Sequence, residues 1–387
     1  MKDKEFLMIP GPTPTPESVL LALAKHPIGH RTPEFSKIFE EVTEGLKWIF
    51  QTKQDVYTFA SSGTGAMEAA IYNTINSGDK ILCLVGGKFG QRWGEIARMK
   101  GAIVDTLDVE WGKPLNVNSL KDILDADKNK EYKAVCITHN ETSTGVTNDL
   151  ESIAKVVKEH GALIIVDAIT SLGAIDLPFD KWGIDIAASG SQKGFMLPPG
   201  LAFIALSDKA WKAVEQCNSP GYYFNLVAAK KNLLKNTTPY TPAVNMFVAL
   251  KIALNMMQDE GLENIFKRHA TLAACVRAAV PPMGLKLFVD DVNARSNSIT
   301  AICPPEGLNA DDFRKSVKKH FDISMAGGQD HLKGKIFRIG HLGFCAPRDI
   351  LATISCMEIS LATLGFDIEF GKGCAAANKT LFDLTKE

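Results

Sequence analysis

Closely spaced cysteines are lacking in this 387-residue sequence, which has eight scattered cysteines and no C-x-x-C pair. Zinc ribbons and iron–sulfur clusters need neighbouring thiolates, so the spacing argues against both and favours reduced thiols in a cytosol-like compartment. An excess of one charge sign is lacking too, since 43 Lys and Arg face 44 Asp and Glu. A net charge of −1 gives no global field that would attract nucleic acid or anionic lipid.

Long hydrophobic runs are also absent. The apolar stretch near the N-terminus is too short for a secretory signal peptide, and no stretch is long enough to span a bilayer. Internal repeats and low-complexity tracts are missing as well. We therefore expect a soluble, cytoplasmic protein without membrane or nucleic-acid partners, long enough for about two to three domains.

Strand-length apolar runs alternate with helical patterns through the first half of the chain. The predicted strands are 80–85, 103–107, 134–138, 163–166 and 184–188, and helical patterns such as 91–100 and 150–160 separate them. This alternation predicts crossover connections and a largely parallel sheet with helices on both faces. Ligands of such sheets bind beyond the carboxyl ends of the strands.

The pattern then changes at a long helical stretch, 245–280, with a possible break near Gly261. Strands at 285–289, 298–303 and 336–339 and helices at 309–320 and 348–364 predict a small α+β domain after it. We expect four parts, namely an extended N-terminal arm (1–16), a large domain (17–258), a small domain (259–365) and a tail without assigned role (366–387).

One lysine lies in unusual surroundings. Lys193 belongs to the segment SGSQKG (189–194), between the apolar run 183–188 and a second run, 201–206, that follows Pro-Pro-Gly. Burial lowers the pKa of an amine and makes it a nucleophile toward carbonyl carbon. A Schiff base with pyridoxal phosphate (PLP) requires such an amine. The alternative for Lys193 alone is a loop lysine that reaches water.

Other segments supply the remaining needs of PLP. Ser62, Gly63 and Thr64 open a predicted helix and offer hydroxyl and N–H donors to a phosphate, although a plain helix cap is the alternative. Asp167 ends an apolar run and supplies a carboxylate for the pyridine nitrogen, with a helix cap again as the alternative.

Ring and substrate contacts have candidates as well. Phe89 follows the predicted strand 80–85 and offers a stacking ring, with Trp93 as the competing choice. Thr142 follows 134–138 and offers a hydrogen bond to the ring oxygen, unless it is only a turn hydroxyl. Arg338 offers a planar guanidinium to a substrate carboxylate, unless it forms a structural salt bridge.

In this order, the segments resemble the class V (fold type I) PLP-dependent aminotransferases, of the alanine–glyoxylate, serine–glyoxylate and serine–pyruvate branch. The similar segments are PGP (10–12), SGT (62–64), HNETSTG (139–145), VD (166–167), SGSQKGFMLPPG (189–200), TPYTP (238–242) and RIG (338–340). The resemblance implies an α/β fold with a large PLP-binding domain, whose mostly parallel sheet lies between helices, and a small C-terminal α+β domain.

The resemblance also implies roles for individual residues. Lys193 forms the Schiff base and Asp167 pairs with the pyridine nitrogen, while Arg338 with Gly11 takes the substrate carboxylate. The remaining cofactor-binding residues are Ser62, Gly63, Thr64 and Gln192 at the phosphate, Phe89 and Ile169 on the two ring faces, Thr142 at the ring oxygen, and Thr238 and Thr241 across a homodimer interface. Some relatives have tyrosine where this chain has Thr238.

The implied activity is ping-pong transfer of an amino group from alanine or serine to glyoxylate or pyruvate. One alternative is desulfurase or lyase chemistry, for which Cys345 is the candidate thiol. Another is a subunit without redox chemistry of its own, since the chain is also similar to proteins labelled soluble hydrogenase 42 kDa (tritium-exchange) subunit. The cysteine spacing predicts no metal site.

Overall fold

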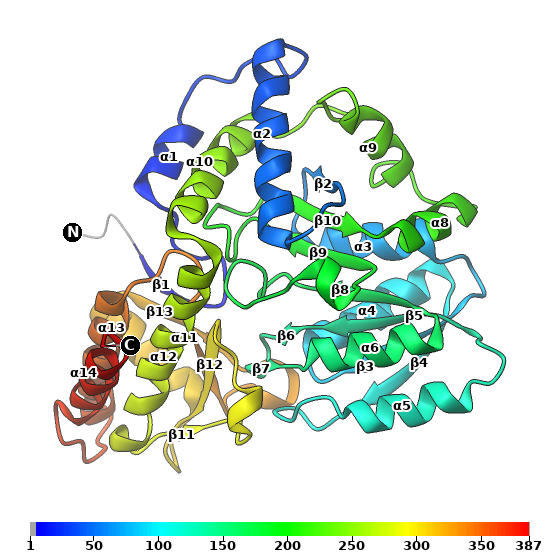
Figure 1. Ribbon diagram of the computed structural model, residues 1–387. Helices are drawn as coiled ribbons and strands as arrows, with labels where there is room; N and C mark the ends of the chain where they lie inside the picture. The colour runs from blue at the N-terminus through cyan, green and yellow to red at the C-terminus, as the bar shows by residue number, and fades with distance from the viewer. Residues whose placement is uncertain (1–4, 387) are drawn as a thin grey trace.

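A seven-stranded sheet forms the centre of the computed structural model, which describes residues 5–386 (Figure 1). In spatial order its strands are β2 (Val56–Phe59), β10 (Ala202–Leu206), β9 (Ile186–Gly190), β8 (Leu163–Asp167), β5 (Tyr132–Thr138), β3 (Lys80–Val85) and β4 (Ile103–Asp108). Only β10 runs antiparallel to its neighbours. The predicted largely parallel sheet is therefore confirmed.

Both faces of this sheet are buried under helices. Alternate residues of β3 show the arrangement, because Leu82 and Leu84 join one apolar cluster while Ile81 and Cys83 join the other. The first cluster is covered by α2 (Pro33–Phe50), α5 (Val117–Ala126), α6 (Leu150–His160) and α10 (Val244–Glu260). The second is covered by α3 (Gly63–Thr74), α4 (Lys88–Lys100), α8 (Asp208–Gln216) and α9 (Leu226–Leu233).

A second sheet, of five strands, brings together the two ends of the chain. Its order is β1 (Phe6–Met8), β13 (Ile323–Gly327), β14 (Phe337–Gly340), β12 (Ile299–Cys303) and β11 (Lys286–Leu287). Strand β1 pairs in parallel with β13, so the N-terminal arm is anchored to the C-terminal part. The sequence analysis did not predict either strand, since β1 has three residues and β13 follows a helix after a single residue.

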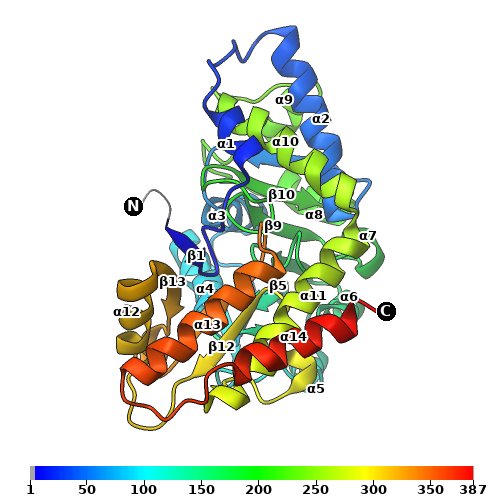
Figure 2. The same ribbon diagram turned by 90° about the vertical axis from the view of Figure 1, so that its left-hand side faces the viewer.

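Four helices pack with the second sheet around one apolar cluster. They are α11 (Leu262–Ala279), α12 (Ala310–Phe321), α13 (Pro347–Thr363) and α14 (Lys372–Leu384). The predicted break at Gly261 is confirmed, because α10 ends and α11 begins there. Figure 2 shows α14, formed by the tail, beside α11 and α13. The domain boundaries stay a prediction.

The remaining elements are short. They are α1 (Glu17–Leu23), α7 (Phe179–Trp182), the hairpin β6 (Asn140–Glu141) and β7 (Val146–Thr147), and three 3₁₀ turns at Pro281–Met283, Val292–Ala294 and Asp330–Leu332. Within residues 5–386, no helix has the length and apolar character to cross a membrane.

Candidate active site

The carboxyl ends of five strands converge on one cavity. Strands β2, β9, β8, β5 and β3 point the same way, so the segments that follow them meet at one edge of the sheet. The cavity spans about 410 Å³, counting the part open to solvent. Its lining residues are Gly63, Thr64, Phe89, Arg92, Asn140, Thr142, Asp167, Ile169, Thr170, Gln192 and Lys193. Eight of these were predicted from the sequence, and Arg92, Asn140 and Thr170 were not.

Lys193 lies in the turn between β9 and β10, as the two flanking apolar runs predict. Its Nζ donates a hydrogen bond to the Pro10 carbonyl at 2.7 Å. Gly11 has φ +138°, and a Cβ there would lie 2.5 Å from Nζ, so only glycine allows this approach. Burial lowers the pKa of Lys193 to about 8, although the nearby Asp167 carboxylate acts in the opposite direction.

Asp167 is the last residue of β8 and is only 3% exposed. Its Oδ1 accepts a hydrogen bond from the Ile169 N–H at 2.8 Å; within residues 5–386 it has no ion pair, and the charges of Arg92 and Lys193 lower its pKa less than burial raises it. Burial raises the pKa of Asp167 to about 7. A buried carboxylate without a cationic partner fits the protonated pyridine nitrogen of PLP.

The N-terminus of α3 faces the same cavity. Gly63 and Thr64 line the cavity from the first turn of this helix, where backbone N–H groups are free and the helix dipole favours an anion. Ser62 is the N-cap residue; its side chain makes no capping bond and does not line the cavity. Gln192 also lines the cavity and carries a side-chain NH₂ group that can donate to an anion, while its buried Oε1 has no partner among the described residues. This donor set fits a phosphate.

Phe89 lies in the first turn of α4, which begins three residues earlier than predicted. The guanidinium of Arg92 lies over its ring, 4.8 Å from the centroid, and donates to the Thr64 hydroxyl at 3.2 Å. Trp93, the competing choice, is fully buried and donates to the Ile137 carbonyl. Trp93 therefore belongs to the core, and Phe89 is the ring that reaches the cavity.

Arg338 lies just outside this cavity, on β14. Its guanidinium donates to the Thr142 carbonyl at 2.6 Å and, through two nitrogens, to the Gly327 carbonyl at 2.6 and 2.9 Å. These bonds use three of its five N–H groups and leave two for a ligand. Arg338 is 6% exposed, and burial lowers its pKa to about 10.

A larger groove lies on the other side of Arg338, and most of its cations are already paired. Arg314, Lys315 and Lys318 form ion pairs with acidic residues on or beside α12. Arg338 also lines this groove and is its one buried charged side chain among the described residues.

Thr238 and Thr241 do not line the cavity of their own chain. The Thr238 hydroxyl donates to the Tyr240 carbonyl at 2.7 Å. Tyr240 stacks with Tyr222 and Tyr223, and this tyrosine cluster is largely exposed.

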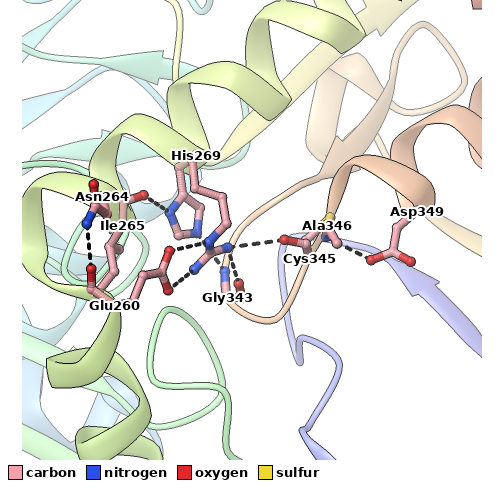
Figure 3. A network of polar contacts seen from close by, with 9 residues as sticks. Glu260, Asn264, Ile265, His269, Gly343, Cys345, Ala346 and Asp349 are labelled. Carbon is pink, nitrogen blue, oxygen red and sulfur yellow. Dashed lines mark hydrogen bonds and ion pairs between the residues drawn. The ribbon is translucent and has the colours of Figure 1, made fainter. Parts of the chain in front are cut away.

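A polar network supports the loop behind Lys193 (Figure 3). Gly343 donates its N–H to His269 Nε2 at 3.0 Å, and its carbonyl accepts from Arg268, which also pairs with Glu260. Burial lowers the pKa of His269 to about 3, so the ring is neutral and can accept this bond. The loop after β14 is thereby fixed to α11.

Cys345 belongs to this loop, and its main-chain carbonyl accepts a hydrogen bond from Arg268. The Cys345 side chain is buried, and burial raises the pKa of its thiol to about 12. A desulfurase requires an exposed thiolate, so the structure does not favour Cys345 as a nucleophile.

The pKa of Lys193 leads to a testable prediction. In the protein without any cofactor, we expect acylation of Lys193 to rise with pH to a midpoint near pH 8, because only the neutral amine reacts. Asp167→Asn should move the midpoint below that of the wild type, since the lost carboxylate favoured the charged amine. Peptide mass spectrometry measures the labelling, with exposed lysines as internal reference. An unchanged or higher midpoint in Asp167→Asn would contradict the coupling.

Comparison with known proteins gives the family. The profile described as Aminotransferase class-V matches residues 6–343. A protein of Synechococcus sp. named soluble hydrogenase, small subunit, is 54% identical over 98% of this chain and 99% of its own. The L-aspartate–glyoxylate aminotransferase of Paracoccus denitrificans (98% and 96% covered) and the serine–glyoxylate aminotransferase of Hyphomicrobium methylovorum (96% and 93%) are each 39% identical.

A solved structure agrees over the whole chain. The ureidoglycine–glyoxylate aminotransferase of Bacillus subtilis superposes with a TM-score of 0.92 at 30% identity, covering 100% of this chain and 99% of that one. The predicted fold type I architecture is thereby confirmed. The chain belongs to the class V aminotransferases, as its sequence motifs predicted.

Proposed function

We propose that this aminotransferase uses PLP to move an amino group from a small amino acid, alanine or serine, to a small 2-oxo acid, glyoxylate or pyruvate. The observation that carries the proposal is the cavity that holds both Lys193 and Asp167. Burial brings the pKa of Lys193 to about 8, close to the pH at which proton transfer is efficient, and Asp167 supplies a carboxylate for the pyridine nitrogen.

When bound, PLP supplies an electron sink for the substrate's α-carbon. Lys193 would hold the cofactor as a Schiff base and would accept and return the substrate's α-proton as general base and acid. Asp167 keeps the pyridine nitrogen protonated. The other proposed cofactor contacts are Ser62, Gly63, Thr64 and Gln192 at the phosphate, Phe89 and Ile169 on the ring faces, and Thr142 at the ring oxygen.

The names of relatives support glyoxylate as the acceptor more directly than they support any one amino donor. The names of the Paracoccus, Hyphomicrobium and Bacillus proteins give three different amino donors with the same acceptor, glyoxylate. A shared acceptor with changing donors fits a ping-pong cycle, in which the two substrates bind in turn. Arg338, assisted by Gly11, suits the carboxylate that every one of these substrates presents.

We also propose a cytoplasmic homodimer in which Thr238 and Thr241 reach the partner's phosphate site. The tyrosine cluster beside them supports this arrangement, because Tyr222 is 80% exposed and exposed aromatic clusters are typical of interfaces. The division into a large domain (17–258) and a small one (259–365) is part of the same proposal.

Substitution of the lysine tests the function. We expect purified wild-type protein to show the absorbance of bound PLP and to transfer amino groups between the proposed substrates. Lys193→Ala should fold, lose the Schiff-base absorbance and lose turnover, because no other lysine among residues 5–386 lines the cavity. Absorbance spectra measure the Schiff base. Single-turnover rates with alanine, serine, aspartate, glyoxylate and pyruvate measure amino-group transfer. Normal activity in Lys193→Ala would overturn the proposal.

The carboxylate contact is tested at Arg338. Loss of a hydrogen-bonded charge typically costs about 2–3 kcal/mol, so kcat/KM of Arg338→Ala should fall by about two orders of magnitude. Arg338→Lys should recover little, since ammonium lacks the planar fork. Both half-reactions should be affected. Arg314→Ala is the control, because Arg314 also bonds a main-chain carbonyl nearby. A wild-type rate in either half-reaction of Arg338→Ala would assign the arginine a structural role.

The dimer is tested on the tyrosine cluster. We expect light scattering of the wild type to give twice the mass of one chain. The double change Tyr222→Asp and Tyr223→Asp should yield monomers with weaker PLP binding, because charges are costly at a buried interface. Met99→Asp is the control at another exposed apolar residue. A fully active monomeric wild type would refute shared sites.

A further inference from the structure

Glu141 is a buried carboxylate that the proposed chemistry does not use. It lies on β6, is 2% exposed, and accepts hydrogen bonds from two directions. Oε2 accepts from the N–H groups of Phe89 at 3.1 Å and Gly90 at 3.0 Å, in the first turn of α4. Oε1 accepts from the N–H of Ser143, at 3.2 Å, and from its hydroxyl. The side chain thus joins two loops about fifty residues apart in sequence.

The join between these loops is tightly packed. A Cβ at Gly87 would lie 2.4 Å from Glu141 Cδ and 2.3 Å from Ser143 Oγ. Ser143 Oγ also accepts from the Lys88 N–H at 3.0 Å. The start of α4 therefore has no room to shift relative to the 141–143 turn.

Both loops carry residues that line the Lys193 cavity. Phe89 comes from the first loop and Thr142 from the second. The Thr142 carbonyl also accepts the Arg338 guanidinium at 2.6 Å. The position of Glu141 consequently determines the spacing between the ring that faces the cofactor and the arginine that faces the substrate.

We propose that Glu141 is a positioning residue that fixes the Phe89 ring, Thr142 and Arg338 relative to one another around PLP. This inference rests on the proposed function of the Lys193 cavity.

An ionised carboxylate suits this position better than an amide. Four donors converge on its two oxygens, and a glutamine would turn its NH₂ group toward one pair of them. The Glu141 charge also raises the pKa of Arg338, against the effect of burial. Glu141→Gln therefore loses acceptors on one loop and the charge that favours Arg338, while it conserves side-chain size.

A second buried glutamate provides a matched control. Glu358 is 3% exposed and accepts from the N–H groups of Gly371 at 2.8 Å and Gly373 at 2.7 Å, at the start of α14. Like Glu141, Glu358 accepts hydrogen bonds from the N-terminus of a helix. It lies on α13, however, in the apolar cluster that packs against the second sheet. A purely structural role would make Glu141→Gln and Glu358→Gln behave alike.

The experiment measures four quantities in both variants: thermal unfolding, the PLP dissociation constant, circular dichroism in the cofactor's absorption band, and kcat/KM. We expect similar losses of thermal stability. Only Glu141→Gln should change the circular dichroism band, weaken PLP binding several-fold and lower kcat/KM by about 10- to 100-fold. Ser143→Ala removes one bond to Oε1 and should give smaller changes in the same direction.

The outcomes separate the two proposals. A wild-type protein that takes up no PLP refutes the proposed function. If the wild type binds PLP but Glu141→Gln matches it in affinity, band shape and kcat/KM, the positioning role is wrong. Equal losses in Glu358→Gln would also overturn it. Should Glu141→Gln fail to fold, Ser143→Ala decides, since unchanged cofactor spectra and kinetics there contradict the inference.

Discussion

Desolvation of the Lys193 amine is the condition on which the site depends. In water an ammonium group would stay protonated at neutral pH, and it would not attack a carbonyl. Here the Pro10 carbonyl and the glycine beside it enclose the amine, and burial brings its pKa down to about 8. The same burial raises the pKa of Asp167 to about 7, and a protonated pyridine nitrogen beside it would favour its ionised form.

The sheet topology makes this environment possible. Five parallel strand ends deliver short segments to one edge, and each segment contributes few residues. The cavity therefore needs a specific side chain at only a few positions. Many of its hydrogen-bond donors are main-chain N–H groups at the ends of helices. Arg338 belongs to the other sheet, and its bond to the Thr142 carbonyl connects that sheet to the cavity, whereas its bonds to Gly327 stay within its own sheet.

Local signals in the sequence were sufficient to predict the positions of Lys193 and Asp167, because each residue ends or follows a buried strand. They were insufficient where a role depends on a partner distant in sequence. Glu141 was part of a quoted motif, yet nothing in that motif reveals its bonds to Phe89 and Gly90. Arg92 and Asn140 were missed for the same reason, although each lies within three residues of a predicted contact. Strand β1 was missed because its three residues pair with β13, at the other end of the chain, and periodicity cannot detect such a distant partner.

The pairing of β1 with β13 has a consequence for the order of events during synthesis. Ribosomes deliver a chain from its N-terminus, and domains form as their residues emerge. All seven strands of the central sheet have emerged by Leu206, but the partner of β1 ends at Gly327. Until then the start of the arm, which leads to the Pro10 carbonyl beside Lys193, lacks its strand partner, although the Thr13 bonds to Gln192 and Lys193 and the packing of α1 on α10 can already form. A nascent chain therefore contains Lys193 more than one hundred residues before β13 anchors the start of the arm beside it.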